Sequence, residues 1–261
     1  MPVSEDKHAA LASLFQTAVV VQSCDITDFQ SSLGPREREA ARSMVQKRID
    51  EFSSGRHCAR LAAAQLALTP KQQTQICDIA IGSSRQPLWP EGVIGSITHD
   101  DARAIVVLSV DPTCAGVGID LQSLAERQSM SELHGIIGSK TEVRAAVDQL
   151  SRSTAYTDVV QNEGLDTASA VVFSIKEAVF KCFFPIFGIW IDFTDVTIDL
   201  ACHEVDGFSC HAMRACIVGS YTVRFSQPIA SRMTTLEQLY FRGHYLLTQE
   251  SVVSTAELIQ P

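Results

Sequence analysis

Three short β-like runs follow one another in the middle of this chain of 261 residues, at positions 93–98, 105–110 and 117–121. Polar residues, glycine and proline separate the runs, so we expect them to form neighbouring strands. Helix-like stretches precede them at 35–52 and 56–68. Strands and helices in this order restrict the chain to folds in which sheets and helices pack on one another, with mixed α and β content.

Proline, glycine and serine predict where several elements begin and end. Pro35 opens the first of these helices, Ser53-Ser54-Gly55 predicts a break before the second, and Pro185 predicts the end of a helix over 174–184. The 138–142 stretch resembles a helix start. Other β-like runs and a hairpin signal lie at 18–21, 196–200, 209–217, 221–225 and Asp206-Gly207.

The charge balance argues against a nucleic-acid-binding protein. The formal net charge is −9, whereas phosphate backbones are held mainly by clustered Lys and Arg. One segment is locally basic, because residues 36–60 contain seven Lys and Arg against four Asp and Glu. Such a segment is usually a solvated helix face, but it can also receive a small anionic ligand.

The eight cysteines include no C-x-x-C pair, in a chain much longer than a disulfide-stapled secreted domain. This usage favours free thiols in a reducing compartment. No run approaches the roughly 20 apolar residues that a membrane-spanning helix needs. We therefore expect a cytoplasmic protein that does not enter the membrane.

The first candidate site is GVGIDLQ, residues 116–122, in which Asp120 ends a predicted strand. Alternation along the strand puts Asp120 and Gln122 on the same side. A carboxylate with a second oxygen two residues later is a reasonable half-site for Mg²⁺, which prefers oxygen ligands. Taken alone, an Asp at a strand end is more often a turn or helix-cap residue.

The second candidate site is FSIKEAVFKCFF, residues 173–184. Ser174, Glu177 and Lys181 form one polar stripe on an otherwise apolar helix. A capping box and an ordinary ion pair would explain these three residues without any function. The surrounding phenylalanines argue for a mostly buried helix, however, and partly buried charges need partners, metals or a chemical task.

The third candidate site is the proline-containing loop and strand at residues 83–100. His99 and the Thr98 hydroxyl can bind phosphate oxygens, and Arg85 adds a fixed positive charge. Arg56 and Arg60, near the start of a predicted helix, are also suited to phosphate. By default each of these residues would be a solvated or capping residue.

Four motifs in a fixed order resemble the phosphopantetheinyl transferases of the surfactin-synthase and enterobactin-synthase type. They are GRHCAR from Gly55, WPEGVIGSITH from Trp89, GVGIDLQ from Gly116 and FSIKEAVFK from Phe173. The resemblance spans about residues 34–200 and is closest to the enterobactin-synthase branch. It implies an α+β fold of two similar α/β halves related by pseudo-two-fold symmetry. We expect an N-terminal half at 1–115, a C-terminal half at 116–240 and a C-terminal tail at 241–261.

The resemblance also implies roles for the candidate residues. Asp120 and Glu177 would hold Mg²⁺ against the pyrophosphate of coenzyme A, and Lys181 would contact phosphate and offset charge during transfer. Gln122 replaces a glutamate that many relatives carry, and would bind the metal through its amide oxygen or through water. Glu177 would then be the base for the attacking serine. The remaining residues would bind coenzyme A, with Thr98 and His99 at the phosphates and Arg56, Arg60 and Arg85 at the 3′-phosphate and adenosine side.

The implied activity is transfer of 4′-phosphopantetheine from coenzyme A to a serine of an apo carrier protein, with release of 3′,5′-ADP. The carriers of fatty-acid, polyketide or nonribosomal peptide synthesis, including siderophore pathways, would be the partners of a monomeric enzyme. One alternative is a non-catalytic module that binds coenzyme A or carrier protein. Another is a metal site formed by cysteines and histidines of the C-terminal part: Cys202, His203, Cys210, His211 and Cys216.

Overall fold

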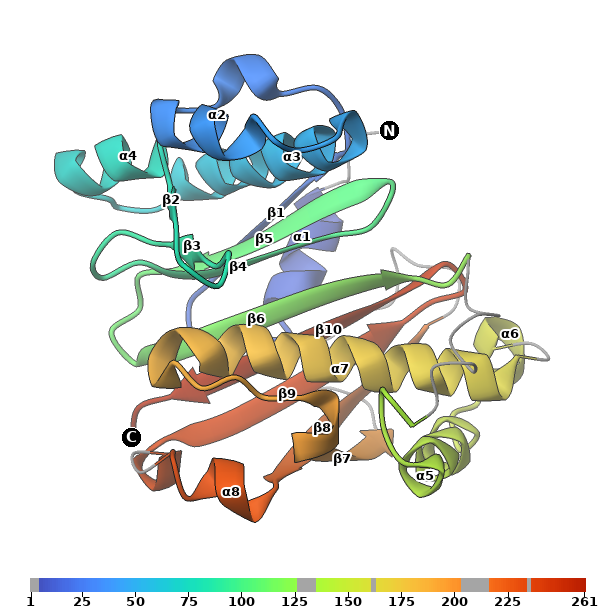
Figure 1. Ribbon diagram of the computed structural model, residues 1–261. Helices are drawn as coiled ribbons and strands as arrows, with labels where there is room; N and C mark the ends of the chain where they lie inside the picture. Colours follow the sequence, from blue (N-terminus) through green and yellow to red (C-terminus); the bar gives the residue numbers. More distant parts are fainter. Residues whose placement is uncertain (1–4, 126–134, 161–162, 203–215, 234–235) are drawn as a thin grey trace.

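The computed structural model describes residues 5–125, 135–160, 163–202, 216–233 and 236–261. Its main feature is a pair of antiparallel sheets, each covered by one long helix (Figure 1). The three-stranded sheet has the order β1 (Val20–Asp25), β5 (Arg103–Ser109), β4 (Ile94–His99). The five-stranded sheet has the order β6 (Cys114–Ser123), β10 (Ser251–Ile259), β9 (Tyr240–Leu247), β8 (Ile217–Phe225), β7 (Val196–Cys202). The expected α+β fold is confirmed.

The two halves share one topology. In each sheet the first strand pairs antiparallel with the last, β1 with β5 and β6 with β10. The long helix lies between the first strand and the remaining strands in the chain: α3 (Gln46–Ala63) in the first half and α7 (Gly164–Phe187) in the second. Each helix packs on its own sheet. The predicted pair of similar halves is therefore visible in the order of the strands.

The two sheets meet where β4 lies beside β6. Two side chains of β4 accept hydrogen bonds from backbone amides of β6. The Ser96 hydroxyl accepts from the Ile119 N–H at 3.2 Å, and the Thr98 hydroxyl accepts from the Leu121 N–H at 3.0 Å. Because these bonds replace a regular strand ladder, the position of one half against the other depends on two small hydroxyl side chains.

The first half also contains α1 (Glu5–Ala12), η1 (Gln30–Ser32), α2 (Pro35–Ala41), α4 (Pro70–Ile76) and a small β2–β3 hairpin (Ala80–Ile81, Pro87–Leu88). The predicted helix break at Ser53-Ser54-Gly55 is wrong, because these residues lie inside α3. The hydroxyls of Ser53 and Ser54 accept hydrogen bonds from the N–H groups of Phe29 and Thr27. The two serines therefore anchor the loop after β1, and the break between helices falls earlier, at 42–45.

Helix α7 is longer than the sequence predicts. It begins ten residues before Ser174 and runs through Pro185, where we expected it to end. Pro185 is exposed and lies in the last turn, where a missing N–H is tolerated because little helix follows. The helix ends at Gly188, whose φ of 62° is the left-handed conformation that glycine adopts without strain, and whose N–H donates to the Phe184 carbonyl.

The prediction of a C-terminal tail at 241–261 is wrong. Residues 240–259 form β9 and β10, and β10 is the strand between β6 and β9. Every residue of β10 is buried, because neighbouring strands cover both its edges and packed side chains cover its faces. The second half therefore extends to the end of the chain and needs β10 to bring β6 into its sheet.

The remaining elements of the second half are α5 (Lys140–Leu150), α6 (Tyr156–Val160), η4 (Phe193–Asp195), α8 (Gln227–Ala230) and η6 (Leu236–Gln238). The helix start predicted at 138–142 is confirmed, since the Ser139 hydroxyl caps α5 by accepting from the Glu142 N–H. Of the run predicted as a strand at 209–217, only Ile217 is a described strand residue. Asp206-Gly207 lies outside the described residues.

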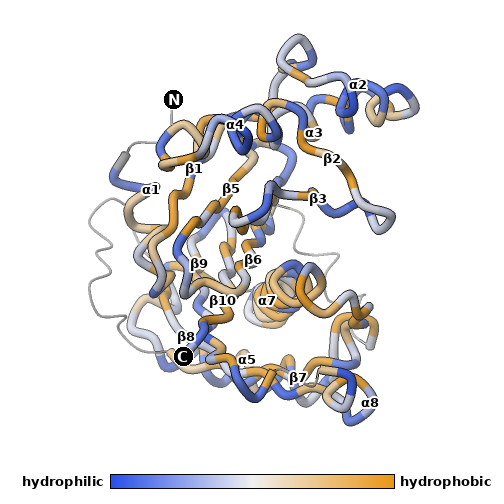
Figure 2. Tube along the Cα trace, turned by 90° about the vertical axis from the view of Figure 1, so that its left-hand side faces the viewer, coloured by the Kyte–Doolittle hydropathy of each residue, from blue (hydrophilic) through white to orange (hydrophobic). Residues whose placement is uncertain are grey.

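The hydrophobic core follows the two long helices. Figure 2, in which α7 is seen end-on, shows that helix coloured mainly as hydrophobic where it lies against the second sheet. Six cysteines carry free thiols, but Cys216 is disulfide-bonded, so the expectation of free thiols is wrong there; Cys210 lies outside the described residues. Among the described helices, none combines the length and apolar character needed to span a membrane.

Candidate active site

Two glycines of β6 allow α7 to pack directly on that strand. A Cβ added at Gly118 would collide with the carbonyl oxygen of Ala178 and lie 2.8 Å from the amide nitrogen of Cys182. A Cβ added at Gly116 would lie 3.0 Å from the Cys182 carbonyl oxygen. Because side chains alternate along a strand, Asp120 lies on the same face as these glycines and is directed toward α7.

Asp120 is buried, with 5% of its surface exposed, at the junction of the two halves. Its Oδ1 accepts from Lys181 Nζ of α7 at 2.6 Å and from the Thr98 hydroxyl of β4 at 3.2 Å. Its Oδ2 is buried and has no hydrogen-bond partner in the described part of the chain. A buried carboxylate oxygen without a partner is unfavourable, and a bound cation would satisfy it.

Glu177 lies one helical turn before Lys181 on α7. Burial raises the pKa of its carboxyl group, the Lys181 ammonium opposes that rise, and the Asp120 carboxylate adds to it. The two carboxylates therefore interact electrostatically across the β6–α7 interface. Two carboxylates that repel one another in a partly buried position form a site that gains stability when a divalent cation binds.

An apolar cavity of about 220 Å³ adjoins Glu177. It lies between α7 and the segment that leads from α7 to β7, and Phe180, Trp190 and Phe193 line it together with Glu177. The Trp190 ring packs edge-on against the Phe180 ring, with 5.0 Å between the ring centroids. The Trp190 ring N–H donates to Asp192 Oδ1 at 2.9 Å. A carboxylate that lines a mainly apolar cavity can serve a ligand that is charged at one end and apolar at the other.

His99, at the end of β4, contacts two charged residues of α3. Its Nε2 lies 2.6 Å from Arg48 Nη1, and Glu51 Oε2 lies 3.1 Å from the same guanidinium nitrogen. Burial lowers the pKa of His99, with Arg48 and Lys181 adding to the decrease and Glu51 opposing it. Sequence reasoning did not single out Arg48, although it lies in the locally basic 36–60 segment that indicated an anion site.

Arg56 and Arg60 are not solvated surface charges. Both pair with Glu37, a fully buried carboxylate at the start of α2, and Arg60 also donates to the Cys77 carbonyl at 3.0 Å. Burial lowers the pKa of Arg56 to about 10. No contact in the described part of the chain joins either arginine to Asp120 or Glu177, so the structure gives them a role in holding α2 on α3.

Two other predicted residues, Arg85 and Gln122, make no hydrogen bond to Asp120 or Glu177 among the described residues. Arg85 is exposed on the β2–β3 turn, where its φ is 66°. Gln122 is half-buried on the same strand as Asp120, and its side-chain N–H donates to the Ser123 carbonyl at 3.0 Å. That bond orients the Gln122 amide through its nitrogen and leaves its oxygen free of hydrogen bonds among the described residues.

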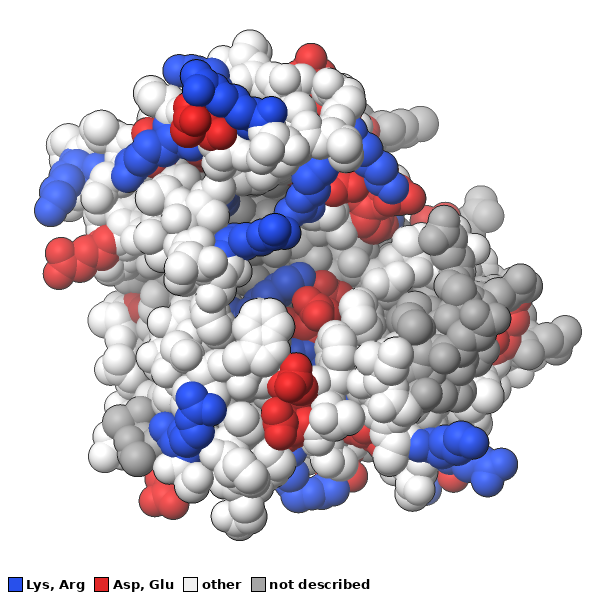
Figure 3. Space-filling view, viewed as in Figure 1, with Lys and Arg blue, Asp and Glu red and all other residues white. Residues whose placement is uncertain are grey.

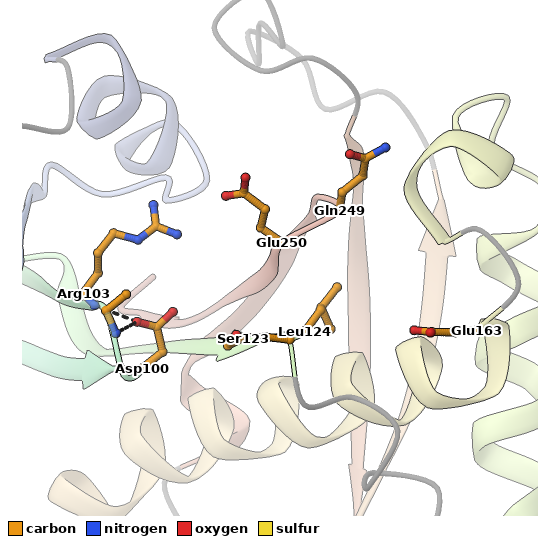
Figure 4. Close-up of a pocket in the computed structure, with 9 residues that line it drawn as sticks. Asp100, Arg103, Ser123, Leu124, Glu163, Gln249 and Glu250 are labelled. Carbon is orange, nitrogen blue, oxygen red and sulfur yellow. Dashed lines mark hydrogen bonds between the residues drawn. The ribbon is translucent and has the colours of Figure 1, made fainter. Parts of the chain in front are cut away.

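A larger cavity of about 530 Å³ lies elsewhere, among the β4–β5 turn, the end of β6, the start of α7 and the β9–β10 turn (Figure 4). Asp100 Oδ1 closes the β4–β5 turn by accepting hydrogen bonds from the N–H groups of Ala102 and Arg103. Figure 4 shows the Glu250 and Glu163 side chains on different sides of this cavity. None of the predicted site residues is among its described lining residues.

The surface is hollowed where the two halves meet. Figure 3 shows a depression between the first half and α7, with basic side chains along its upper rim and both acidic and basic side chains inside. A protein of net charge −9 therefore presents positive groups where the two halves meet. Such a depression favours a ligand with several negative charges.

Comparison with known families agrees with this geometry. One family model, the 4′-phosphopantetheinyl transferase N-terminal domain, matches residues 36–109, and the model of the 4′-phosphopantetheinyl transferase superfamily matches residues 116–225. The chain belongs to the 4′-phosphopantetheinyl transferase superfamily. The boundary between the two matches falls where the chain passes from the first sheet to the second.

Several characterised relatives are similar over part of their length. The chain is 26% identical over 182 residues to the 4′-phosphopantetheinyl transferase Npt of Nocardia iowensis, covering 68% of this chain and 72% of that one. It is 28% identical to PptT of Mycobacterium tuberculosis, covering 63% of each. It is 35% identical over 126 residues to enterobactin synthase component D of Escherichia coli, covering 48% of this chain and 52% of that one. The matches thus span between half and three quarters of these relatives.

One solved structure is also similar, a holo-(acyl-carrier-protein) synthase from Bacillus anthracis in complex with coenzyme A (3′,5′-ADP). It is 17% identical, with a TM-score of 0.34, and the match covers 57% of this chain and 98% of that one. At this level of similarity the residue roles depend on the geometry around Asp120 and Glu177.

Proposed function

We propose that this chain transfers 4′-phosphopantetheine from coenzyme A to a serine of an apo carrier protein and releases 3′,5′-ADP. The observation that carries the proposal is the contact of Asp120 with Lys181 and Thr98, beside Glu177, at the junction of the halves. A buried acid pair next to a lysine suits a diphosphate bound with a metal ion. Family membership supports the same reaction.

The residues present fit a magnesium ion. Asp120 Oδ2 is an unsatisfied buried oxygen, and the Glu177 carboxyl group is destabilised in its charged form by burial and by Asp120. We assign Asp120 and Glu177 as ligands, with Gln122 contributing its amide oxygen directly or through water. When bound, Mg²⁺ supplies charge neutralisation at the pyrophosphate of coenzyme A.

The side chains around this position divide the work of the transfer. The serine Oγ attacks the β-phosphorus, the bond from that phosphorus to the bridging oxygen of 3′,5′-ADP breaks, and Glu177 accepts the serine proton. Lys181 offsets the charge that accumulates on the leaving oxygen, and Thr98 and His99 hold phosphate oxygens.

We revise the assignment for the 3′-phosphate and adenosine side of coenzyme A. Arg48, which contacts His99, is placed to add a guanidinium to the phosphate-binding group. Arg85 stays a candidate because it is exposed. Arg56 and Arg60, predicted for this role, are held by Glu37 and are assigned to stability instead.

The apolar cavity beside Glu177 suits the arm of the substrate. With the pyrophosphate at Asp120 and Lys181, an arm that leaves the β-phosphate past Glu177 enters the space lined by Phe180 and Trp190. The partners are then coenzyme A and apo carrier proteins of fatty-acid, polyketide or nonribosomal peptide synthesis. We propose a monomeric, cytoplasmic enzyme, since each half contributes residues to one site.

Mass spectrometry of an apo carrier protein incubated with coenzyme A and Mg²⁺ tests this function. Glu177→Ala is expected to leave the fold intact and reduce transfer by at least about 100-fold, and EDTA should abolish transfer by the unmodified protein. Asp199→Asn, an exposed acid of β7, is the matched control and should transfer normally. Full modification by the Glu177 variant would contradict the assignment. Binding of coenzyme A without transfer would indicate the non-catalytic module instead.

A further inference from the structure

Lys176 directly precedes Glu177, but its ammonium group is bonded inside the protein. Only 3% of the Lys176 surface is exposed. Its Nζ donates to Glu142 Oε2 of α5 at 2.9 Å and to the Phe193 carbonyl of η4 at 2.8 Å. Lys176 and Glu177 both line the cavity, but the Lys176 ammonium group is bonded to Glu142 and to the Phe193 carbonyl.

Glu142 connects the same lysine to the sheet. Its Oε1 accepts from the Ile198 N–H of β7 at 2.8 Å, while its Oε2 binds Lys176. A Cβ at Gly138 would collide with this carboxylate, so the chain leaves room for it. One buried ion pair therefore ties together α5, α7, η4 and β7, and each of its charges has a second hydrogen-bond partner.

The segment held by this pair forms one wall of the cavity beside Glu177. It leads from Gly188 to Asp195 and contains Trp190 and Phe193, which line the cavity. Ring contacts also hold it, because Phe193 packs on Phe173 at 5.3 Å. The Lys176 bond to the Phe193 carbonyl fixes the backbone of this wall where ring packing alone would allow sliding.

We propose that Lys176 and Glu142 are a positioning pair that sets the wall of this cavity and thereby the affinity for the arm of coenzyme A, without contacting the substrate. The inference rests on the proposed function for the identity of the ligand. Lys176 would have to leave both its protein partners, and strand a buried Glu142, to reach a phosphate. The neighbouring Lys181 is 25% exposed and already lies at Asp120, so phosphate contact belongs to that lysine.

A double-mutant cycle tests the pair. Glu142→Gln, Lys176→Met and the double variant should each raise the KM for coenzyme A about tenfold, with kcat changed less than about threefold and the KM for the carrier protein unchanged. Because the residues act as one unit, the double variant should be no worse than either single variant. Asp199→Asn and Arg224→Gln, which break an exposed ion pair between β7 and β8, are the controls and should leave both KM values unchanged.

Trp190 provides a readout that does not depend on turnover. In a Trp89→Phe background it is the one remaining tryptophan of the chain. A looser wall should increase the acrylamide quenching constant of Trp190 in both single variants. Bound coenzyme A should also protect Trp190 from quenching less in these variants than in the protein with Lys176 and Glu142 intact. Lys176→Arg keeps the positive charge and changes the shape of the hydrogen-bond donor. The quenching of Trp190 in this variant tests whether the wall depends on that shape when the charge of the buried ion pair is kept.

The outcomes separate this proposal from the function itself. A large effect of Lys176→Met on kcat, with Glu142→Gln silent, would show that Lys176 contacts the substrate and would overturn the proposal. Unchanged quenching and KM in all variants would also overturn it. If the unmodified protein binds coenzyme A but transfers nothing, the proposed function fails, and the same cycle measured on the Kd for coenzyme A still decides the role of the pair.

Discussion

Gly118→Ala should damage the active site more than any change of similar size on the same strand. An added Cβ would lie 2.8 Å from the Cys182 amide nitrogen and 2.9 Å from the Ala178 carbonyl carbon, and would collide with the oxygen of that carbonyl. All these atoms belong to the backbone of α7, so no side-chain rotation relieves the overlap. Ordinary contact distances require α7 to move away from β6 by roughly 1 Å.

Asp120 lies two residues after Gly118 on β6, so that movement separates it from Lys181 and Glu177 on α7. A misplacement of about 1 Å in a reacting constellation can reduce the rate about 100-fold, and overpacking of this kind costs about 1–3 kcal/mol of stability. We therefore expect a folded protein with the urea midpoint lowered and phosphopantetheine transfer reduced on the order of 100-fold. Denaturant unfolding and the carrier-protein mass assay measure the two quantities on one preparation.

Gly116→Ala is the matched control. There the added Cβ would lie 2.6 Å from the tip of the Ile186 side chain, which can rotate, and 3.0 Å from the Cys182 carbonyl oxygen. It should destabilise the protein less and reduce transfer less than Gly118→Ala. Equal activity of the Gly118 variant and the unmodified protein would refute the argument that close approach of α7 holds the site together.

Two further predictions concern charged groups of the first half. Glu37→Gln should lower the free energy of unfolding, measured in urea, by about 3–5 kcal/mol, because it leaves Arg56 and Arg60 without their buried counter-charge. Glu39 is exposed, so the control Glu39→Gln should change the same free energy by less than about 0.5 kcal/mol. A loss below 1 kcal/mol for Glu37→Gln would contradict the buried cluster. The folded state lowers the pKa of His99 below its ordinary 6.5, so the unfolded chain takes up the proton first and stability falls as the pH drops through 6.5. The free energy of unfolding, measured in urea, should therefore decrease less between pH 7.5 and pH 5.5 in His99→Gln than in the unmodified protein. An identical pH dependence in both proteins would disprove this contribution of His99.

The sequence predicts which side chains of regular elements come together better than it predicts the lengths of those elements. Asp120 and Thr98 were found from their places at the ends of predicted strands and Lys181 from helical spacing, and the structure brings the three into contact. The length of α7 was underestimated because Pro185 is a strong breaker by propensity, yet at the exposed last turn it interrupts little. Local preference was overruled by the position of the residue in the helix.

Residues whose surroundings come from distant parts of the chain could not be predicted. Ser53 and Ser54 look like a helix break, but the loop at Thr27 and Phe29 needs their hydroxyls inside α3. Arg56 and Arg60 resemble phosphate-binding residues until Glu37 is placed between them. In each case the deciding partner is more than 15 residues away, so spacing along one element contains no information about it.

The Thr98 hydroxyl connects the proposed site with the junction of the halves. It accepts from the Leu121 N–H and so joins β4 to β6, and it donates to Asp120 Oδ1 on the adjoining residue. One small group thus contributes to the contact between the sheets and to the orientation of the acid. Since Lys181 binds the same carboxylate oxygen from α7, any shift of one half against the other changes the environment of Asp120. Stability of the interface and competence for transfer are therefore coupled through this carboxylate.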